Sequence, residues 1–81
     1  MDLIEQVKRN KKNQTPRSVI KLLETHGFRY CRSTGDHDFY KRKGFRPIPI
    51  PIRQNPLGIH IVQEVIRTIE EAIEIDGNNN E

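Results

Sequence analysis

Residues 27–44 read GFRYCRSTGDHDFYKRKG, and this stretch decides the fold of the chain. Two short alternating runs, residues 28–33 and 37–43, flank the connection Thr34-Gly35-Asp36. A connection that contains glycine between two strand-like runs is typical of a β-hairpin. The pattern therefore predicts two antiparallel strands, with His37 at the first position of the second. A side chain at that position lies at the rim of a sheet, within reach of solvent and of a polymer lying across it.

In and around the predicted hairpin, basic side chains interleave with the aromatic residues Phe39 and Tyr40. Lysine and arginine attract phosphate groups, and aromatic rings stack on bases, so this combination favours binding of a nucleic acid. We therefore expect RNA to contact a set of basic and aromatic residues around His37, namely Arg29, Arg32, Tyr40, Lys41, Arg42, Lys43 and Arg46.

The charge of the chain is distributed unevenly along the sequence, with a formal net value of +3. Residues 1–57 carry thirteen Lys and Arg against five acidic residues, a net +8, whereas residues 58–81 carry one Arg against six acidic residues, a net −5. A basic surface of this kind favours a polyanion such as RNA or DNA. A solvated basic face without a ligand is the alternative interpretation.

The chain has 81 residues, which predicts a single domain with a small hydrophobic core. Its one cysteine, Cys31, excludes an internal disulfide and so fits a reducing cytosol. Cys31 is expected to be a small strand residue rather than a catalytic thiol, because no nucleophile signature surrounds it. The chain has no long apolar run, and its N-terminus lacks the charged segment followed by an apolar segment that is typical of a signal peptide. We therefore expect a cytoplasmic protein without membrane contact.

Two helices are predicted before the hairpin. Apolar residues at helical spacing predict a short helix over residues 2–9, and a polar, basic loop is expected to follow as far as residue 14. Thr15-Pro16 is a start signal, because threonine can cap free N–H groups and proline suits the first helical position. The apolar face that follows predicts a helix over residues 16–26, with Gly27 as its C-terminal cap.

The stretch Pro47-Ile48-Pro49-Ile50-Pro51-Ile52 has a period of two, with isoleucines on one face and prolines on the other. Alternate N–H groups of an extended chain point to the same edge, so the prolines remove the donors from one edge while the isoleucines can pair on the other. Proline is tolerated only at the edges of sheets, which predicts the last, outermost strand. A polyproline ligand segment is the alternative.

Apolar residues recur every three or four positions from Ile59 to Ile73, which predicts a second long helix over residues 58–75. The acidic residues on its opposite face lack convergent partners, so we expect them to keep the helix soluble rather than to bind a metal. No cofactor is expected either. Residues 76–81 are expected to form a disordered tail.

Together these elements predict an α+β domain of two layers in the order α-β-β-β-α, in which a three-stranded antiparallel sheet packs against two helices. The domain is expected to span residues 15–75, after a short extra helix and basic loop in residues 1–14. This order of elements is also that of the double-stranded RNA-binding fold.

Leu22-Leu23 is followed by Gly27-Phe28, by Arg32, by the Gly35-x-His37 turn, by an aromatic-bearing strand and by a proline-containing third strand. This succession resembles the HicA toxin family over roughly residues 15–72. The resemblance implies a fold like that of double-stranded RNA-binding domains. It also implies the toxin of a type II toxin–antitoxin system, which acts as an mRNA interferase, a metal-independent endoribonuclease with His37 as the catalytic residue. A HicB-type antitoxin protein would silence it.

The sequence departs from the pattern of the family next to the histidine. Asp36 and Asp38 stand where family members often have a serine and a second histidine, and Ile52-Arg53 stands where a further histidine often follows the third-strand proline.

The chemistry expected of His37 needs no metal. A neutral imidazole can take the proton of a ribose 2′-hydroxyl, which then attacks the adjacent phosphorus, while Lys or Arg stabilises the charge on the phosphate. Asp36 and Asp38 can orient the ring, although they also repel a phosphate. The alternatives are a non-catalytic RNA-binding module, a protein-interaction domain for an acidic partner, and a histidine that only hydrogen-bonds the turn.

Overall fold

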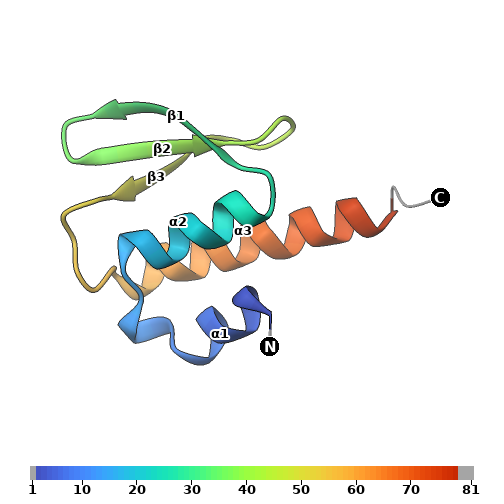
Figure 1. The fold of residues 1–81 in the computed structure, drawn as a ribbon, viewed down its shortest axis with the longest axis horizontal. Coiled ribbons are helices and arrows are strands. Elements are labelled where there is room, and N and C mark those ends of the chain that lie inside the picture. Colours follow the sequence, from blue (N-terminus) through green and yellow to red (C-terminus); the bar gives the residue numbers. More distant parts are fainter. Residues whose placement is uncertain (1, 79–81) are drawn as a thin grey trace.

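A computed structural model of the chain describes residues 2–78 (Figure 1). In chain order its elements are α1 (Leu3–Arg9), a 3-10 turn (Lys11–Asn13), α2 (Pro16–Thr25), β1 (Arg29–Thr34), β2 (His37–Lys41), β3 (Ile48–Pro51) and α3 (Ile59–Asn78). The strands form one antiparallel sheet in the order β1-β2-β3. The helices α2 and α3 cover one face of this sheet, and α1 lies on the far side of them (Figure 1). The predicted α+β fold, with its short extra N-terminal helix, is confirmed.

The start of α2 is held by the side chains of Thr15 and Ser18. The Ser18 N–H donates to the Thr15 hydroxyl at 3.1 Å, and the Thr15 N–H donates to the Ser18 hydroxyl at 3.0 Å. Together they satisfy two N–H groups that a helix leaves without partners at its start. The helix ends at Thr25, one residue before the predicted end, and Gly27 follows with a φ of 90° that favours glycine.

The hairpin turns through only two residues, Gly35 and Asp36, because Thr34 and His37 already pair across the ladder. Gly35 has a φ of 56° at the first central position, which is the requirement of a type II′ turn. The register shifts between Tyr30 and Arg32, so β1 carries a bulge. The predicted hairpin is confirmed, with His37 at the first position of β2.

The third strand pairs with β2 through its isoleucines. Ile48 and Ile50 lie opposite Tyr40 and Asp38, and both isoleucine side chains are buried. Just beyond the strand, the Ile52 N–H donates to the Asp36 carbonyl at 2.9 Å. The prolines therefore occupy the outer edge, and residues 48–51 form an edge strand rather than a polyproline ligand segment.

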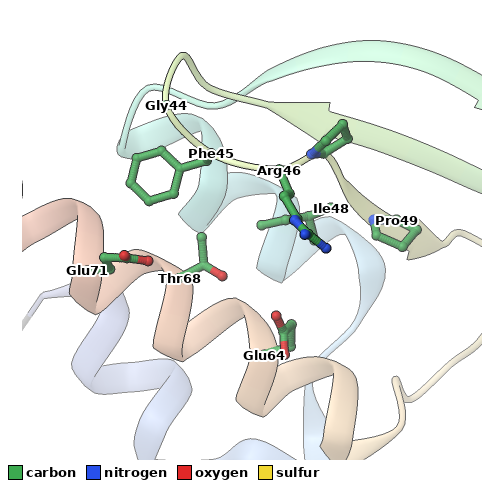
Figure 2. A pocket seen from close by; sticks show the side chains of 9 residues that line it. Gly44, Phe45, Arg46, Ile48, Pro49, Glu64, Thr68 and Glu71 are labelled. Atoms are coloured by element: carbon green, nitrogen blue, oxygen red, sulfur yellow. The ribbon is translucent and has the colours of Figure 1, made fainter.

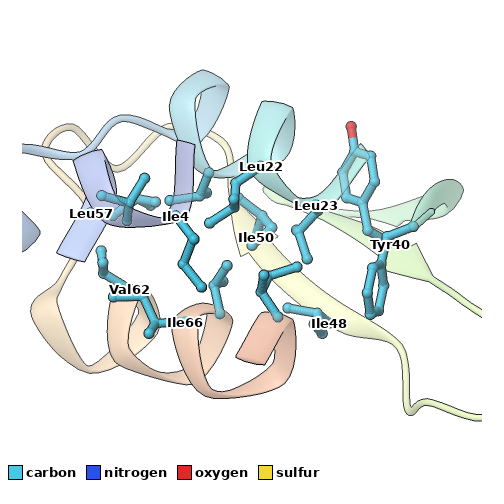
Figure 3. Packing of buried hydrophobic residues seen from close by; sticks show 14 of the residues in the cluster. Ile4, Leu22, Leu23, Tyr40, Ile48, Ile50, Leu57, Val62 and Ile66 are labelled. Carbon is cyan, nitrogen blue, oxygen red and sulfur yellow. The ribbon is translucent and has the colours of Figure 1, made fainter. Parts of the chain in front are cut away.

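One hydrophobic core lies between the sheet and the helices. Figure 3 shows buried side chains from the sheet, from α2 and from α3 meeting in this layer. The largest fully buried side chains are Phe28, Leu22, Leu23, Ile50, Ile69, Val19, Val62 and Val65. On the other side of the helices, Ile4 and Val7 of α1 join the same core.

The C-terminal helix is longer than the sequence predicted. It continues through Asp76, Gly77 and Asn78, where a disordered tail was expected. Arg42, from the loop after β2, forms an ion pair with Asp76 and so holds the last part of the helix. Local composition does not reveal this contact between distant residues. The rest of the expected tail, residues 79–81, lies outside the described residues.

A search of residues 2–78 finds no helix that is long and apolar enough to cross a membrane.

Replacing Ile50 by alanine is expected to destabilise the domain by about 2–5 kcal/mol, because it leaves a cavity in a core that cannot collapse freely. Ile50 is 0% exposed, whereas Ile52, two residues further on, is 39% exposed. Ile52→Ala is therefore the matched control and should cost far less. Urea unfolding followed by circular dichroism measures both variants. Equal losses of stability would contradict the packing of β3 against the helices.

Candidate functional site

The two faces of the sheet have different roles. Successive side chains of a strand point to opposite faces, and directly paired residues share a face. Tyr40 of β2 is buried beside its partner Ile48, so this face packs on the helices. His37, Phe39 and Lys41 alternate with Tyr40 and therefore lie on the opposite, open face of the sheet.

His37 stands at one end of the open face. It pairs with Thr34 on β1 and with Pro51 on β3, and its side chain is exposed. Among the contacts within residues 2–78, no hydrogen bond or ion pair engages the imidazole. The ring is therefore open to solvent, and the alternative in which it serves only to hydrogen-bond the turn has no contact to support it.

Arg53 reaches the same end of the sheet. Its guanidinium Nε lies 3.4 Å from a carboxylate oxygen of Asp36, the residue before His37. The hydrogen bond from the Ile52 N–H to the Asp36 carbonyl joins the two segments there. Sequence reasoning did not assign Arg53 to the site. The pairing register of β3 would have revealed it, because Pro51 lies opposite His37 and the turn that contains Arg53 follows directly.

Asp38 does not share a face with His37. It pairs with Ser33 and with the buried Ile50, which places it on the side of the helices, and it is half-buried. The prediction that Asp38 orients the imidazole is therefore wrong in this structure, because neighbours in a strand point in opposite directions. Asp36 remains near His37, and its charge is balanced by Arg53.

Arg32 is the predicted RNA contact that lies closest to His37 along the sheet. Its cross-strand partner is Phe39, and its guanidinium carbon lies 4.2 Å from the centre of the Phe39 ring. Phe39 follows His37 by two residues, or about 7 Å along the strand. The pair presents a cation and an apolar plane on the open face beside the histidine.

The two arginines Arg29 and Arg42 are engaged with helix ends. Arg29 donates to the carbonyls of Glu24 and Phe28 at 3.0 and 2.9 Å. Arg42 donates to the His26 carbonyl at 3.0 Å and pairs with Asp76. The Glu24 and His26 carbonyls lie at the C-terminal end of α2, where carbonyls lack partners within the helix, so both guanidinium groups supply donors there.

The Arg42 pair shifts the titration of both partners. A hydrogen bond from Arg42 lowers the pKa of Asp76 below its ordinary value of 3.8, and the charge of Arg42 acts in the same direction. The same hydrogen bond raises the pKa of Arg42. Both shifts favour the charged forms of the pair that joins the loop after β2 to the last turn of α3.

Lys41, Lys43 and Arg46 lie at the end of the sheet opposite His37. Lys41 is four residues from His37, which corresponds to about 13 Å along the strand. Its Nζ donates to the Phe45 carbonyl at 3.2 Å. Arg46 lines a hollow of about 350 Å³ between this loop and α3, with Glu64, Thr68 and Glu71 on the helical side (Figure 2). The sequence placed these cations around His37, but the extended strand separates them from it.

Tyr40 is a core residue, although we expected RNA to contact it. It is 7% exposed, and its ring centre lies 6.0 Å from that of Tyr30 in an edge-to-face arrangement. Burial raises the pKa of the Tyr40 hydroxyl, and the charges of Glu24 and Asp38 add to this effect. The aromatic ring on the open face is Phe39.

Within residues 2–78 no group of three or more His, Cys, Asp or Glu side chains is arranged to hold a metal ion.

The chain was then compared with known proteins. The family model of the HicA toxin of bacterial toxin-antitoxin systems matches residues 16–71. This range begins at the first residue of α2, includes the whole sheet and ends within α3. No curated protein and no solved structure matches the chain.

We predict that Asp76→Asn destabilises the domain at neutral pH and that the difference from the unaltered chain disappears in acid. The pKa of Asp76 is lowered in the folded state, so its charged form stabilises the fold above the ordinary value of 3.8. This contribution is lost as the pH falls through the lower pKa of the folded state. Urea unfolding at a series of pH values measures the difference, and a constant difference at all pH values would contradict the ion pair.

Arg42→Ala should lower stability in the same way, because it also removes the donor that the His26 carbonyl has at the end of α2. Lys43→Ala is the matched control, since it removes the neighbouring positive charge and has no such contact among the described residues. Equal stabilities of the two variants would show that Arg42 does not hold the helix ends.

Proposed function

The chain belongs to the HicA toxin family of bacterial toxin-antitoxin systems, and from this premise we propose that it is the toxin of a type II system. It acts as a metal-independent endoribonuclease on messenger RNA, with His37 as the catalytic residue. The observation that carries the proposal is the position of His37, whose exposed and unengaged imidazole stands at the edge of an open sheet face. Arg32 and Arg53 supply positive charge on either side of it.

The proposed reaction is an internal transfer at one phosphodiester. His37 takes the proton of the ribose 2′-hydroxyl, and the 2′-oxygen forms a bond to the adjacent phosphorus. The bond from phosphorus to the 5′-oxygen of the next nucleotide breaks, and that oxygen receives a proton from the imidazolium or from water. The products are a 2′,3′-cyclic phosphate and a free 5′-hydroxyl. No redox partner or metal takes part in these steps.

Single-stranded RNA is proposed to lie along the open face, from the hairpin turn toward the loop after β2. Phe39 and Arg32 offer a surface on which a base can stack, and Lys41 follows on the same face. Lys43 and Arg46 lie further on, in the loop after β2, where they can attract the next phosphates of the RNA backbone. The cleavage chemistry at His37 and the basic residues that attract the RNA strand thus lie at opposite ends of β2.

A HicB-type antitoxin is proposed as the partner that silences the toxin in the cytoplasm. A partner that covers the open face between His37 and Lys41 would deny RNA access to the histidine. It should be acidic where it meets Arg32 and Lys41, because opposite charges speed the encounter and make the partner compete with RNA. Binding would also stabilise the small domain by mass action.

A non-catalytic RNA-binding module is the second candidate. The observation that favours it is the absence, within residues 2–78, of a side chain hydrogen-bonded to the His37 imidazole, since catalytic histidines are usually oriented by such a partner. The position of Asp38 on the other face of the sheet removes one residue that was expected to supply this contact.

His37→Ala is expected to lower the rate of RNA cleavage by about 10²–10⁴-fold, the usual contribution of a general acid or base. Because the side chain is exposed, stability should change by no more than about 0.5 kcal/mol. The assay follows a long single-stranded RNA in the presence of EDTA. His60→Ala, an exposed histidine on α3, is the control and should cleave like the unaltered chain.

The outcomes of this assay separate the candidates. Cleavage by the unaltered protein that is lost only in His37→Ala supports the ribonuclease. Salt-sensitive retention of RNA without cleavage would select the RNA-binding module. Cleavage that EDTA abolishes would refute the metal-independent mechanism.

Replacing both Lys41 and Lys43 by alanine is expected to weaken RNA binding and to reduce its dependence on salt. For two phosphate contacts to a single strand, the slope of log affinity against log salt should fall by about 1.4. The matched variant replaces Lys11 and Lys12 by alanine. It makes the same change of charge beside α1, on the far side of the helices from the sheet (Figure 1). Binding titrations at several salt concentrations measure both. Equal slopes would show that RNA does not follow the open face.

A further inference from the structure

The end of the sheet that carries His37 holds an exposed cation, Arg53, that was not included in the predicted RNA surface. Arg53 lies in the turn after β3, and its side chain is 81% exposed, against 59% for the carboxylate of Asp36 that it contacts. The residue was not among the expected RNA contacts, and nothing in the fold of the core requires its charge.

The backbone at Arg53 is nevertheless well fixed. Before it, the Ile52 N–H donates to the Asp36 carbonyl at 2.9 Å, and after it, the Gln54 N–H donates to the Pro51 carbonyl at 3.2 Å. Pro51 in turn lies opposite His37 in the ladder. These constraints hold the start of the Arg53 side chain near Asp36, the residue before the histidine, while its guanidinium lies in solvent.

The ion pair between Arg53 and Asp36 is weak enough to be exchanged. Exposed pairs of this kind contribute about 0–1 kcal/mol, because water screens the charges and two long side chains lose freedom. The two non-bridging oxygens of a phosphodiester offer the same guanidinium a two-point hydrogen-bonding partner, which arginine binds well. Exchanging one anion for the other therefore costs little.

Other cations are less suited to the phosphate at His37. Lys41 is about 13 Å away along β2, beyond the reach of one phosphate group. Arg32 lies over the Phe39 ring, about 7 Å along the sheet, where it is placed for an adjacent base or phosphate. Among the described cations, Arg53 is the one that contacts Asp36, the residue before the histidine, and the N–H groups of both its chain neighbours are hydrogen-bonded at this end of the sheet.

We propose that Arg53 is a second catalytic residue, which binds the phosphate under attack, and that Asp36 holds its guanidinium while no RNA is bound. The inference rests on the proposed ribonuclease function and names the charge-stabilising group of that same site. Attack by the 2′-oxygen raises the negative charge on the phosphoryl oxygens from one to two. The contact with Arg53 therefore strengthens in the transition state, so its effect falls mainly on kcat.

Four variants test the proposal: Arg53→Ala, Arg53→Lys, Asp36→Asn and the double variant Asp36→Asn/Arg53→Ala. Arg53→Ala should lower kcat by about 10²–10³-fold with a smaller change in KM, as expected for loss of a charge-stabilising donor. Arg53→Lys should recover part of this loss, because it restores the charge without the two-point geometry. Asp36→Asn should raise kcat/KM by up to about 5-fold, because it releases Arg53 from an exposed ion pair whose free energy corresponds to a factor of that size.

The double variant separates catalysis from a general effect of charge. If Asp36 acts by holding Arg53, the gain from Asp36→Asn must vanish once Arg53 is replaced. The matched pair is Arg67 with Glu64, an exposed ion pair on α3, whose Arg67→Ala and Glu64→Gln variants carry the same changes of charge. These two variants should leave cleavage unchanged, and thermal unfolding should show all six variants folded.

Cleavage by Arg53→Ala at the rate of Arg67→Ala would overturn the proposal. So would a gain from Asp36→Asn that persists without Arg53. If the unaltered chain cleaves no RNA, the proposed function fails by itself, and binding of a 2′-O-methyl oligonucleotide, which cannot be attacked, then decides the role of Arg53. Asp36→Asn must tighten that binding when Arg53 is present and leave it unchanged when Arg53 is replaced. Any other result overturns the phosphate contact.

Discussion

The fold depends on the backbone ladder of β2, the strand that pairs with β1 on one side and with β3 on the other. The ladder sets the register, and the register decides which side chains enter the core. Tyr40 lies beside Ile48 against the helices, whereas His37 faces outward opposite Pro51. A shift of one residue would bury the histidine and expose the tyrosine. Core and site are therefore consequences of the same pairing.

The prolines of β3 protect this arrangement. The isoleucine N–H groups point toward β2, so the missing donors of Pro49 and Pro51 fall on the outer edge of the sheet. An incoming strand finds no N–H group there at the proline positions, which limits association along that edge. At the other edge, β1 carries a bulge between Tyr30 and Arg32, a second device that discourages pairing with another chain.

Much of the fold was predictable because its signals are local. The capping residues before α2, the glycine in the hairpin turn and the alternation of isoleucine with proline each specify a short segment. The family resemblance was likewise carried by short motifs and agrees with the match to residues 16–71. The end of α3 was not predictable in this way, because its last turn is held by Arg42 from a distant loop.

The arrangement of charge was harder to predict for a physical reason. Residues close in sequence were expected to surround His37, but a strand extends by about 3.3 Å per residue, so Lys41 lies at its other end. Long side chains added a second difficulty, since Arg29 and Arg42 reach back to helix carbonyls. Arg53, sixteen positions after His37 in the chain, comes beside it only because the third strand runs antiparallel to the second.

These contacts divide the cations by their function in the folded chain. Arg29 and Arg42 donate to carbonyls at the C-terminal end of α2, so their positive charge is already used for stability. Among the described residues Arg53 is paired only with the exposed carboxylate of Asp36, and the proposed exchange of that carboxylate for a phosphate would leave the core and the ladder unchanged. A small domain has little stability to lose, so a site that rearranges on binding must do so through side chains outside the core. The hairpin end meets this condition, because its backbone is fixed by hydrogen bonds while the side chains of Asp36, His37 and Arg53 lie in solvent.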